Sequence, residues 1–310
     1  MFGRPALRTW LYRAGLLLGG LLFGYQVWLA VSDLRRAQFP ITVRPELLLL
    51  SLGLYLAAYL LIMVAWQRFM YSVGVSMRMG AIVEGYALSF LPRYIPGTIW
   101  GYASRSEWAL RNYAVPASRS WFASLIEVGA QAGTAATLAA LLIGVWQPQL
   151  APAAWALPVL WLAGWWVLRL LARRIGDGAS VRWLAWGGGV AIYLGFWLVH
   201  GAATMQLAAA FGAPSSAPFA AYTFAFAAAW LIGFVVIFLP AGLGLREASL
   251  AFLLQQLVLM PPETAALVAV SSRLLLIVAE LLLLLVGMLR FGVRSRPGRR
   301  FPSNHESDFI

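Results

Sequence analysis

Long apolar runs make up most of the chain, and short segments rich in arginine or proline separate them. About 20 apolar residues are needed for a helix to cross the hydrocarbon core of a bilayer. The chain has six runs of this kind, which predict spanning helices at about 14–31, 47–66, 119–145, 153–171, 183–211 and 264–290. We therefore predict an all-α, polytopic membrane protein. The stretch 67–80 is predicted to form a separate amphipathic helix at the membrane surface.

Two further regions, at about 82–112 and 217–259, are each predicted to form a helix, a break and a second helix. Proline and glycine interrupt helical hydrogen bonding, and hydrocarbon cannot satisfy the freed backbone groups. Each break must therefore lie against protein or line a wet cavity, as in a re-entrant hairpin. A second hairpin that crosses the membrane fully fits the topology equally well. The breaks are Phe90-Leu91-Pro92-Arg93-Tyr94-Ile95-Pro96-Gly97 and Phe238-Leu239-Pro240-Ala241-Gly242-Leu243-Gly244-Leu245-Arg246-Glu247.

The chain carries a net charge of +12 and contains no lysine. Its arginines are therefore the residues that predict the orientation of these segments. Basic residues cluster before the first span, at 169–182 and after the last span, and the positive-inside rule places such clusters in the cytoplasm. The loop at 32–46 is the exception, since it carries three arginines and yet must face outward. This orientation predicts cytoplasmic N- and C-termini in a bacterial inner membrane.

The same threading gives two halves of opposite orientation, at about 14–145 and 153–290, within one transmembrane domain at 1–292. Such an inverted repeat is typical of secondary transporters. Residues 293–310 are predicted to form a basic, disordered cytoplasmic tail. Short matches support the repeat: Phe90-Leu91-Pro92 resembles Phe238-Leu239-Pro240, and Ser118-Arg119 precedes Glu127 as Ser272-Arg273 precedes Glu280.

Composition excludes several kinds of chemistry. The chain has no cysteine, which excludes disulfides, thiol nucleophiles and thiolate metal centres. With only His200 and His305, a histidine metal site is not expected. We find no nucleotide-binding or hydrolase motif. The sequence therefore predicts no cofactor and no enzyme activity.

Eight ionisable residues lie in or beside the membrane-embedded segments, where an exposed charge is costly. We expect them to face the bundle interior and to pair with one another. Arg246 and Glu247 point about 100° apart on one helix, so each is predicted to find a partner in the opposite half. Structural ion pairs that lock the halves together are the alternative to a binding site. The eight are Glu84, for which a position at the membrane interface is an alternative, and the predicted site residues Arg105, Glu107, Glu127, Arg246, Glu247, Arg273 and Glu280.

The break residues complete the predicted site. A helix that starts after each break, near Gly97 and Gly244, presents backbone N–H groups and the positive end of its dipole. The guanidinium fork of arginine suits a phosphodiester. The site is therefore predicted to bind a phosphate-bearing, anionic lipid, with Glu247 and Glu127 balancing charge or accepting a cationic headgroup. Its backbone part comprises Pro92, Pro96, Gly97, Pro240, Gly242 and Gly244.

Two stretches carry a resemblance to a known family. Phe90 to Arg105 with Glu107, and Leu239-Pro240-Ala241-Gly242-Leu243-Gly244-Leu245-Arg246-Glu247 followed by Arg273, resemble the membrane region of the lysylphosphatidylglycerol synthase family. The resemblance extends over about residues 15–292. It implies a flippase-like protein that moves a lipid across the bilayer. We expect a membrane-only member without the soluble synthase domain.

The predicted function is thus translocation of a phospholipid or a polyprenyl-linked glycolipid. Similar membrane regions accompany polyprenyl-phosphate glycosyltransferases, so one alternative is a non-catalytic membrane partner of a glycosyltransferase or lipid-modifying enzyme. Co-purification with such an enzyme would favour that alternative. An intramembrane enzyme acting on lipid phosphates is a third hypothesis, and it requires lipid turnover by the purified protein.

Overall fold

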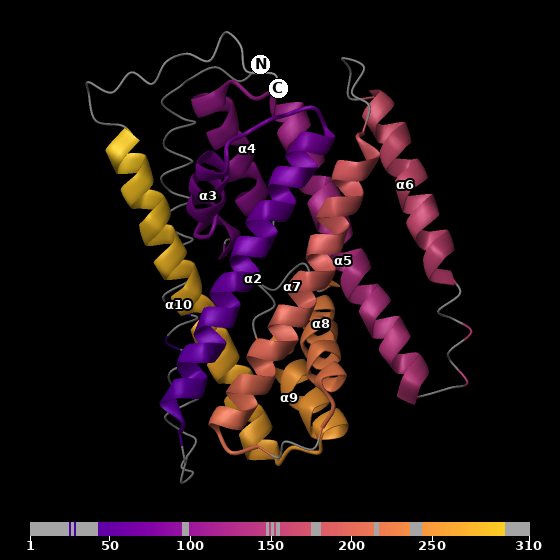
Figure 1. Cartoon of the computed structure of the whole chain (residues 1–310), viewed down its shortest axis with the longest axis vertical. Helices are drawn as coiled ribbons and strands as arrows, with labels where there is room; N and C mark the ends of the chain where they lie inside the picture. The colour runs from indigo at the N-terminus through magenta and orange to yellow at the C-terminus, as the bar shows by residue number, and fades with distance from the viewer. Residues whose placement is uncertain are drawn as a thin grey trace.

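The computed structural model describes residues 43–94, 99–146, 156–174, 181–213, 217–235 and 244–294, together with positions 25, 28, 149 and 152. This part of the chain is all-α (Figure 1). It comprises α2 (Pro45–Ser72), α3 (Met79–Leu88), the 3₁₀ turn η1 (Pro92–Tyr94), α4 (Trp100–Tyr113), α5 (Ala117–Trp146), α6 (Ala156–Arg174), α7 (Trp183–Ala210), α8 (Phe219–Val235), α9 (Leu245–Val258) and α10 (Pro262–Arg294).

Three of these helices are long and apolar enough to cross a membrane: α2, α7 and the Pro262–Arg290 part of α10. This indicates a multi-pass membrane protein. Large apolar side chains such as Leu49, Leu160 and Leu285 are exposed on the bundle surface, as contact with lipid requires. Except at positions 25 and 28, the predicted first span lies outside the described residues.

Helices α2 and α7 form an antiparallel pair whose ends are joined by reciprocal backbone hydrogen bonds. The N–H of Arg44, just before α2, donates to the carbonyl of Ala210, the last residue of α7, at 3.0 Å. The N–H of Arg182, just before α7, donates to the carbonyl of Ser72, the last residue of α2, at 2.8 Å. The same offset in residue number separates Arg44 from Arg182 and Ser72 from Ala210. The pair therefore has local two-fold symmetry.

The ends of equivalent helices are also built alike. Helices α2 and α7 both have 28 residues and are followed by a glycine with positive φ, Gly74 (81°) and Gly212 (73°). Helices α4 and α9 both have 14 residues and are followed by a left-handed residue, Ala114 (φ 52°) and Leu259 (φ 54°). In all four places an N–H beyond the helix bonds back into its last turn, which satisfies an otherwise unpaired carbonyl. These bonds are Val75 to Met70 at 2.9 Å, Ala213 to Ala208 at 3.0 Å, Val115 to Ala109 at 3.3 Å and Met260 to Leu254 at 3.4 Å.

The order α2, α3, α4, α5 thus recurs as α7, α8, α9, α10, and α3 and α4 lie at one end of the bundle while α8 and α9 lie at the other (Figure 1). Aligning the turns at Ala114 and Leu259 places Arg246 opposite Gly101 and Glu127 opposite Ser272. The predicted correspondence of Glu127 with Glu280 is therefore wrong. The separate helix predicted at 67–80 is also wrong, because α2 continues to Ser72 and Gly74 then turns the chain.

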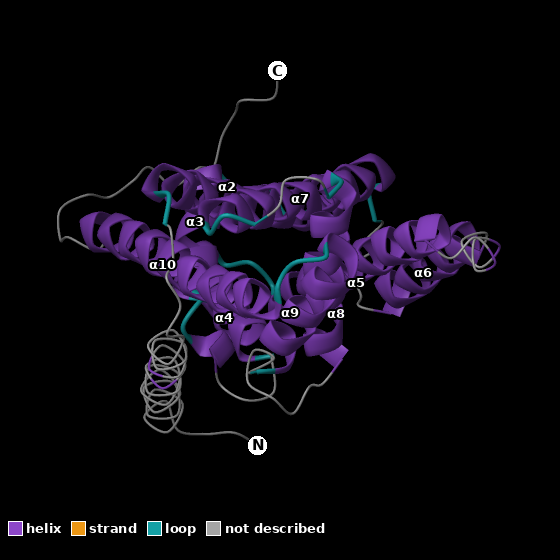
Figure 2. Cartoon of the chain, turned by 90° about the horizontal axis from the view of Figure 1, so that it is seen from below, coloured by secondary structure: helices purple, strands orange, loops and turns teal. Residues whose placement is uncertain are grey.

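Close approach of the helices depends on small residues of α7. A Cβ atom at Gly189 would lie 2.7 Å from Cζ of Phe69 in α2, and one at Gly201 would lie 2.8 Å from Cα of Thr223 in α8. Small residues at such contacts let helix backbones pack closely in a membrane. Helix α6 lies at the outer edge beside α5 (Figure 2), where the indole N–H of Trp161 donates to the Thr137 hydroxyl at 3.0 Å.

Candidate functional site

A cavity of about 180 Å³ lies at the middle of the long helices. Tyr59 is near the midpoint of α2, Phe196 near that of α7 and Leu276 near that of α10, and all three line the cavity. If these helices cross a bilayer, the cavity is at mid-depth. Among the described residues, four arginines line it, Arg93, Arg105, Arg246 and Arg273, together with one carboxylate, Glu280.

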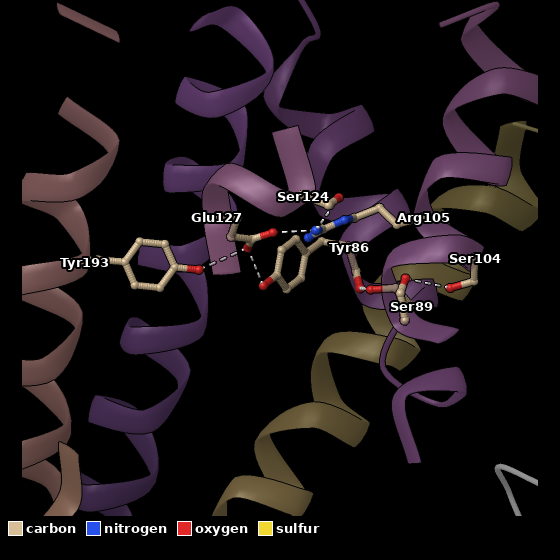
Figure 3. Close-up of polar contacts among 8 residues, drawn as sticks. Tyr86, Ser89, Ser104, Arg105, Ser124, Glu127 and Tyr193 are labelled. Carbon is tan, nitrogen blue, oxygen red and sulfur yellow. Dashed lines mark hydrogen bonds and ion pairs between the residues drawn. The ribbon is translucent and has the colours of Figure 1, made fainter. Parts of the chain in front are cut away.

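Arg105 and Glu127 form a buried ion pair beside the cavity (Figure 3). The side chains are 2% and 1% exposed, so neither charge is solvated by bulk water. The Glu127 carboxylate also accepts hydrogen bonds from the hydroxyls of Tyr86 at 2.9 Å and Tyr193 at 3.0 Å. The Arg105 guanidinium donates to the Ser124 hydroxyl at 3.0 Å. These contacts tie α3, α4, α5 and α7 to one carboxylate.

A second ion pair connects the two halves of the chain. Arg93, in the turn η1, donates to the Glu280 carboxylate of α10, and the Tyr59 hydroxyl of α2 donates to the same oxygen. The guanidinium lies 4.5 Å from the ring centre of Phe90, which adds a cation–π contact. The first break is therefore fixed to a helix of the second half by its own arginine.

The third pair is looser and lies within the second half. Nε of Arg273 in α10 is 3.7 Å from Oε1 of Glu247 in α9. The other oxygen, Oε2, is buried and accepts no hydrogen bond. The expectation that Glu247 pairs with the opposite half is therefore wrong, because a neighbouring helix of the same half supplies its partner.

Arg246 differs from the other three arginines of the cavity. None of the ion pairs and hydrogen bonds among the described residues includes it. Its guanidinium lies 4.9 Å from the ring centre of Phe226 in α8. It projects from the first turn of α9, which Gly244 precedes with a φ of 75°. This position places an arginine without a carboxylate partner at the positive end of a helix dipole.

The remaining predicted site residues fall in three groups. Glu107 does not line the cavity and pairs with exposed Arg111 on the same helix at 2.6 Å. Pro92 is buried in η1. Four of the break residues lie outside the described residues: Pro96, Gly97, Pro240 and Gly242.

Several cavity residues were not predicted from the sequence. Arg93 was visible as the charge within the first break, and that position was the signal that could have identified it. The cavity tyrosines Tyr59 and Tyr86 gave no such signal, and neither did Tyr193 beside Glu127, because aromatic residues are common in most of the apolar runs. His200 also lines the cavity, with Nδ1 3.0 Å from the Phe196 carbonyl.

No family model and no curated protein matches this chain at a significant level. Membership of the lysylphosphatidylglycerol synthase family therefore stays a prediction. The site has to be interpreted from its own geometry.

Tyr193→Phe tests the importance of the carboxylate cluster for stability. It removes one of two tyrosine hydrogen bonds to the buried Glu127 carboxylate, which we expect to cost about 1.5 kcal/mol of unfolding free energy. Tyr71→Phe is the matched control, because that tyrosine is exposed at the end of α2. Thermal unfolding in detergent would measure both. Equal unfolding temperatures for the two variants would contradict the role of the cluster.

Proposed function

We propose that this protein is a lipid translocator, which passes a phosphate-bearing headgroup through the central cavity. The observation that carries the proposal is Arg246, an arginine that pairs with no carboxylate of the described residues and lies in a mid-helix cavity among aromatic side chains. An unpaired guanidinium in such surroundings is unfavourable until an anion arrives. Arginine binds phosphate oxygens through charge-assisted hydrogen bonds.

The arrangement of the helices supports transport across the bilayer. The reciprocal bonds between α2 and α7, the matched turns after α4 and α9, and the placement of α3 and α4 opposite α8 and α9 are what an inverted repeat of six spans and two hairpins would produce. Such a repeat lets one cavity open alternately to either side. We propose that the protein lies in a bacterial inner membrane, and the distribution of its arginines predicts that both termini face the cytoplasm.

Reconstitution of the full chain into vesicles tests the proposal. Phospholipids or polyprenyl phosphates that carry a fluorophore on the hydrocarbon chain are followed by back-extraction from the outer leaflet. Wild-type vesicles should exchange at least one of these lipids faster than empty vesicles, and Arg246→Ala should slow that exchange about tenfold, since a charge-assisted hydrogen bond is lost.

Arg111→Ala is the matched control, because Arg111 is 57% exposed and lies on α4 outside the cavity lining. It should exchange lipid at the wild-type rate. Wild-type vesicles that exchange no lipid faster than empty vesicles would reject translocation. Lipid exchange equally fast in wild type and Arg246→Ala would reject the role given to the cavity.

A further inference from the structure

The charges around the cavity specify its ligand more narrowly than a phosphate-bearing lipid. We infer that the cavity takes a headgroup with one net negative charge, a phosphodiester whose substituent is neutral and carries hydroxyl groups. This inference rests on the proposed function and adds a class of substrate to it.

The arginines of the cavity and the carboxylates that pair with them do not balance. Three of its four arginines each have a carboxylate: Arg93 has Glu280, Arg105 has Glu127 and Arg273 has Glu247. Arg246 takes part in none of these pairs, so the described residues give the site one positive charge in excess. The segments 95–98 and 236–243, which connect helices that carry these arginines, contain no ionisable residue in the sequence. Their positions therefore do not change the balance.

One excess positive charge in the site selects ligands by their net charge. Charges in a poorly solvated site are favourable only when they are balanced. A phosphodiester with a neutral substituent carries one negative charge and neutralises the site. A phosphomonoester carries about −1.5 to −2 at pH 7 and leaves negative charge in excess. A zwitterionic or aminoacylated headgroup leaves the positive charge of Arg246 uncompensated.

The lining of the cavity disfavours an ammonium group on the headgroup. Such a group would need a carboxylate acceptor, and Glu280 is the one carboxylate that the described residues contribute to the cavity lining. That carboxylate already accepts hydrogen bonds from Arg93 and Tyr59. Apart from Glu280 and the arginines, the polar groups of the lining are neutral and suit hydroxyl groups, as on glycerol or a sugar. They include Tyr59, Ser89, Tyr102 and Gln131.

The test compares exchange rates of three lipid classes in vesicles that hold the wild-type chain. Each lipid carries its fluorophore on the hydrocarbon chain, so the headgroup is native. We expect phosphatidylglycerol, a phosphodiester with one negative charge, to exchange at least about tenfold faster than phosphatidylethanolamine or polyprenyl phosphate, because each of those leaves one charge unbalanced. Equal acceleration of all three would overturn the inference and leave the proposed function standing. Acceleration of none would overturn both.

Two charge variants shift the balance in opposite directions. Arg246→Gln makes the site neutral, so the preference for phosphatidylglycerol over phosphatidylethanolamine should fall about tenfold. Glu247→Gln adds one positive charge and should raise exchange of polyprenyl phosphate relative to phosphatidylglycerol. Glu263→Gln is the control for the second variant, since it changes an exposed carboxylate in the first turn of α10. A lipid preference unchanged in both Arg246→Gln and Glu247→Gln would overturn the inference.

Discussion

Glu127→Ala is expected to lower the free energy of unfolding by about 3–5 kcal/mol, because it leaves a buried guanidinium without its counter-charge. The Arg105 side chain is 2% exposed and lies 4.2 Å from the ring centre of Trp66 and 4.6 Å from that of Tyr86. Without Glu127, the Ser124 hydroxyl is the hydrogen-bond acceptor that remains to it among the described contacts. The hydroxyls of Tyr86 and Tyr193 also lose their acceptor. Chemical or thermal unfolding in detergent would measure the loss.

Glu107→Ala is the matched control, because its partner Arg111 is 57% exposed on the same helix. A solvated pair of this kind contributes at most about 1 kcal/mol. The double variant Arg105→Met with Glu127→Leu removes both buried charges together, and we expect it to recover most of the stability lost in the single variant. Similar losses for Glu107→Ala and Glu127→Ala would show that burial of the pair has no energetic consequence.

The helices themselves were predictable, because the length of each apolar run determines where a spanning helix can form. The predicted spans 183–211 and 264–290 match α7 (Trp183–Ala210) and α10 (Pro262–Arg294) to within a few residues. The first break was also visible, since Pro92 and the residues around it cannot continue a helix. A break in a helix depends on the residues next to it in the chain, so it can be read directly from the sequence.

The partners of the charged residues were less predictable. Sequence indicated that Glu127 and Glu280 need internal partners, but Arg105 and Arg93 were identified as those partners by the packing of α4 and η1. The short sequence matches also gave a wrong alignment of the two halves, because both halves contain charged residues but not at equivalent positions. The backbone aligns Glu127 with Ser272, so each half places its charges differently on a shared framework.

Gly201→Ala is expected to lower the free energy of unfolding by about 2–3 kcal/mol, since it overfills a contact between two backbones. The new methyl group would lie 2.8 Å from Cα of Thr223, and a backbone atom cannot turn aside as a side chain can. Helix α8 must then move away from α7. Phe226 lies one helical turn after Thr223 in α8 and packs against Arg246. A shift of α8 should therefore also slow lipid exchange.

Gly195→Ala is the matched control on the same helix, because nothing lies within 4 Å of the position that its Cβ would occupy. This change should be neutral or slightly stabilising, since alanine favours the helix more than glycine does. Unfolding in detergent and lipid exchange in vesicles would be measured for both variants. If Gly201→Ala kept wild-type stability, close packing of α7 on α8 would not be what holds the cavity wall, and the position of Phe226 against Arg246 would need another cause.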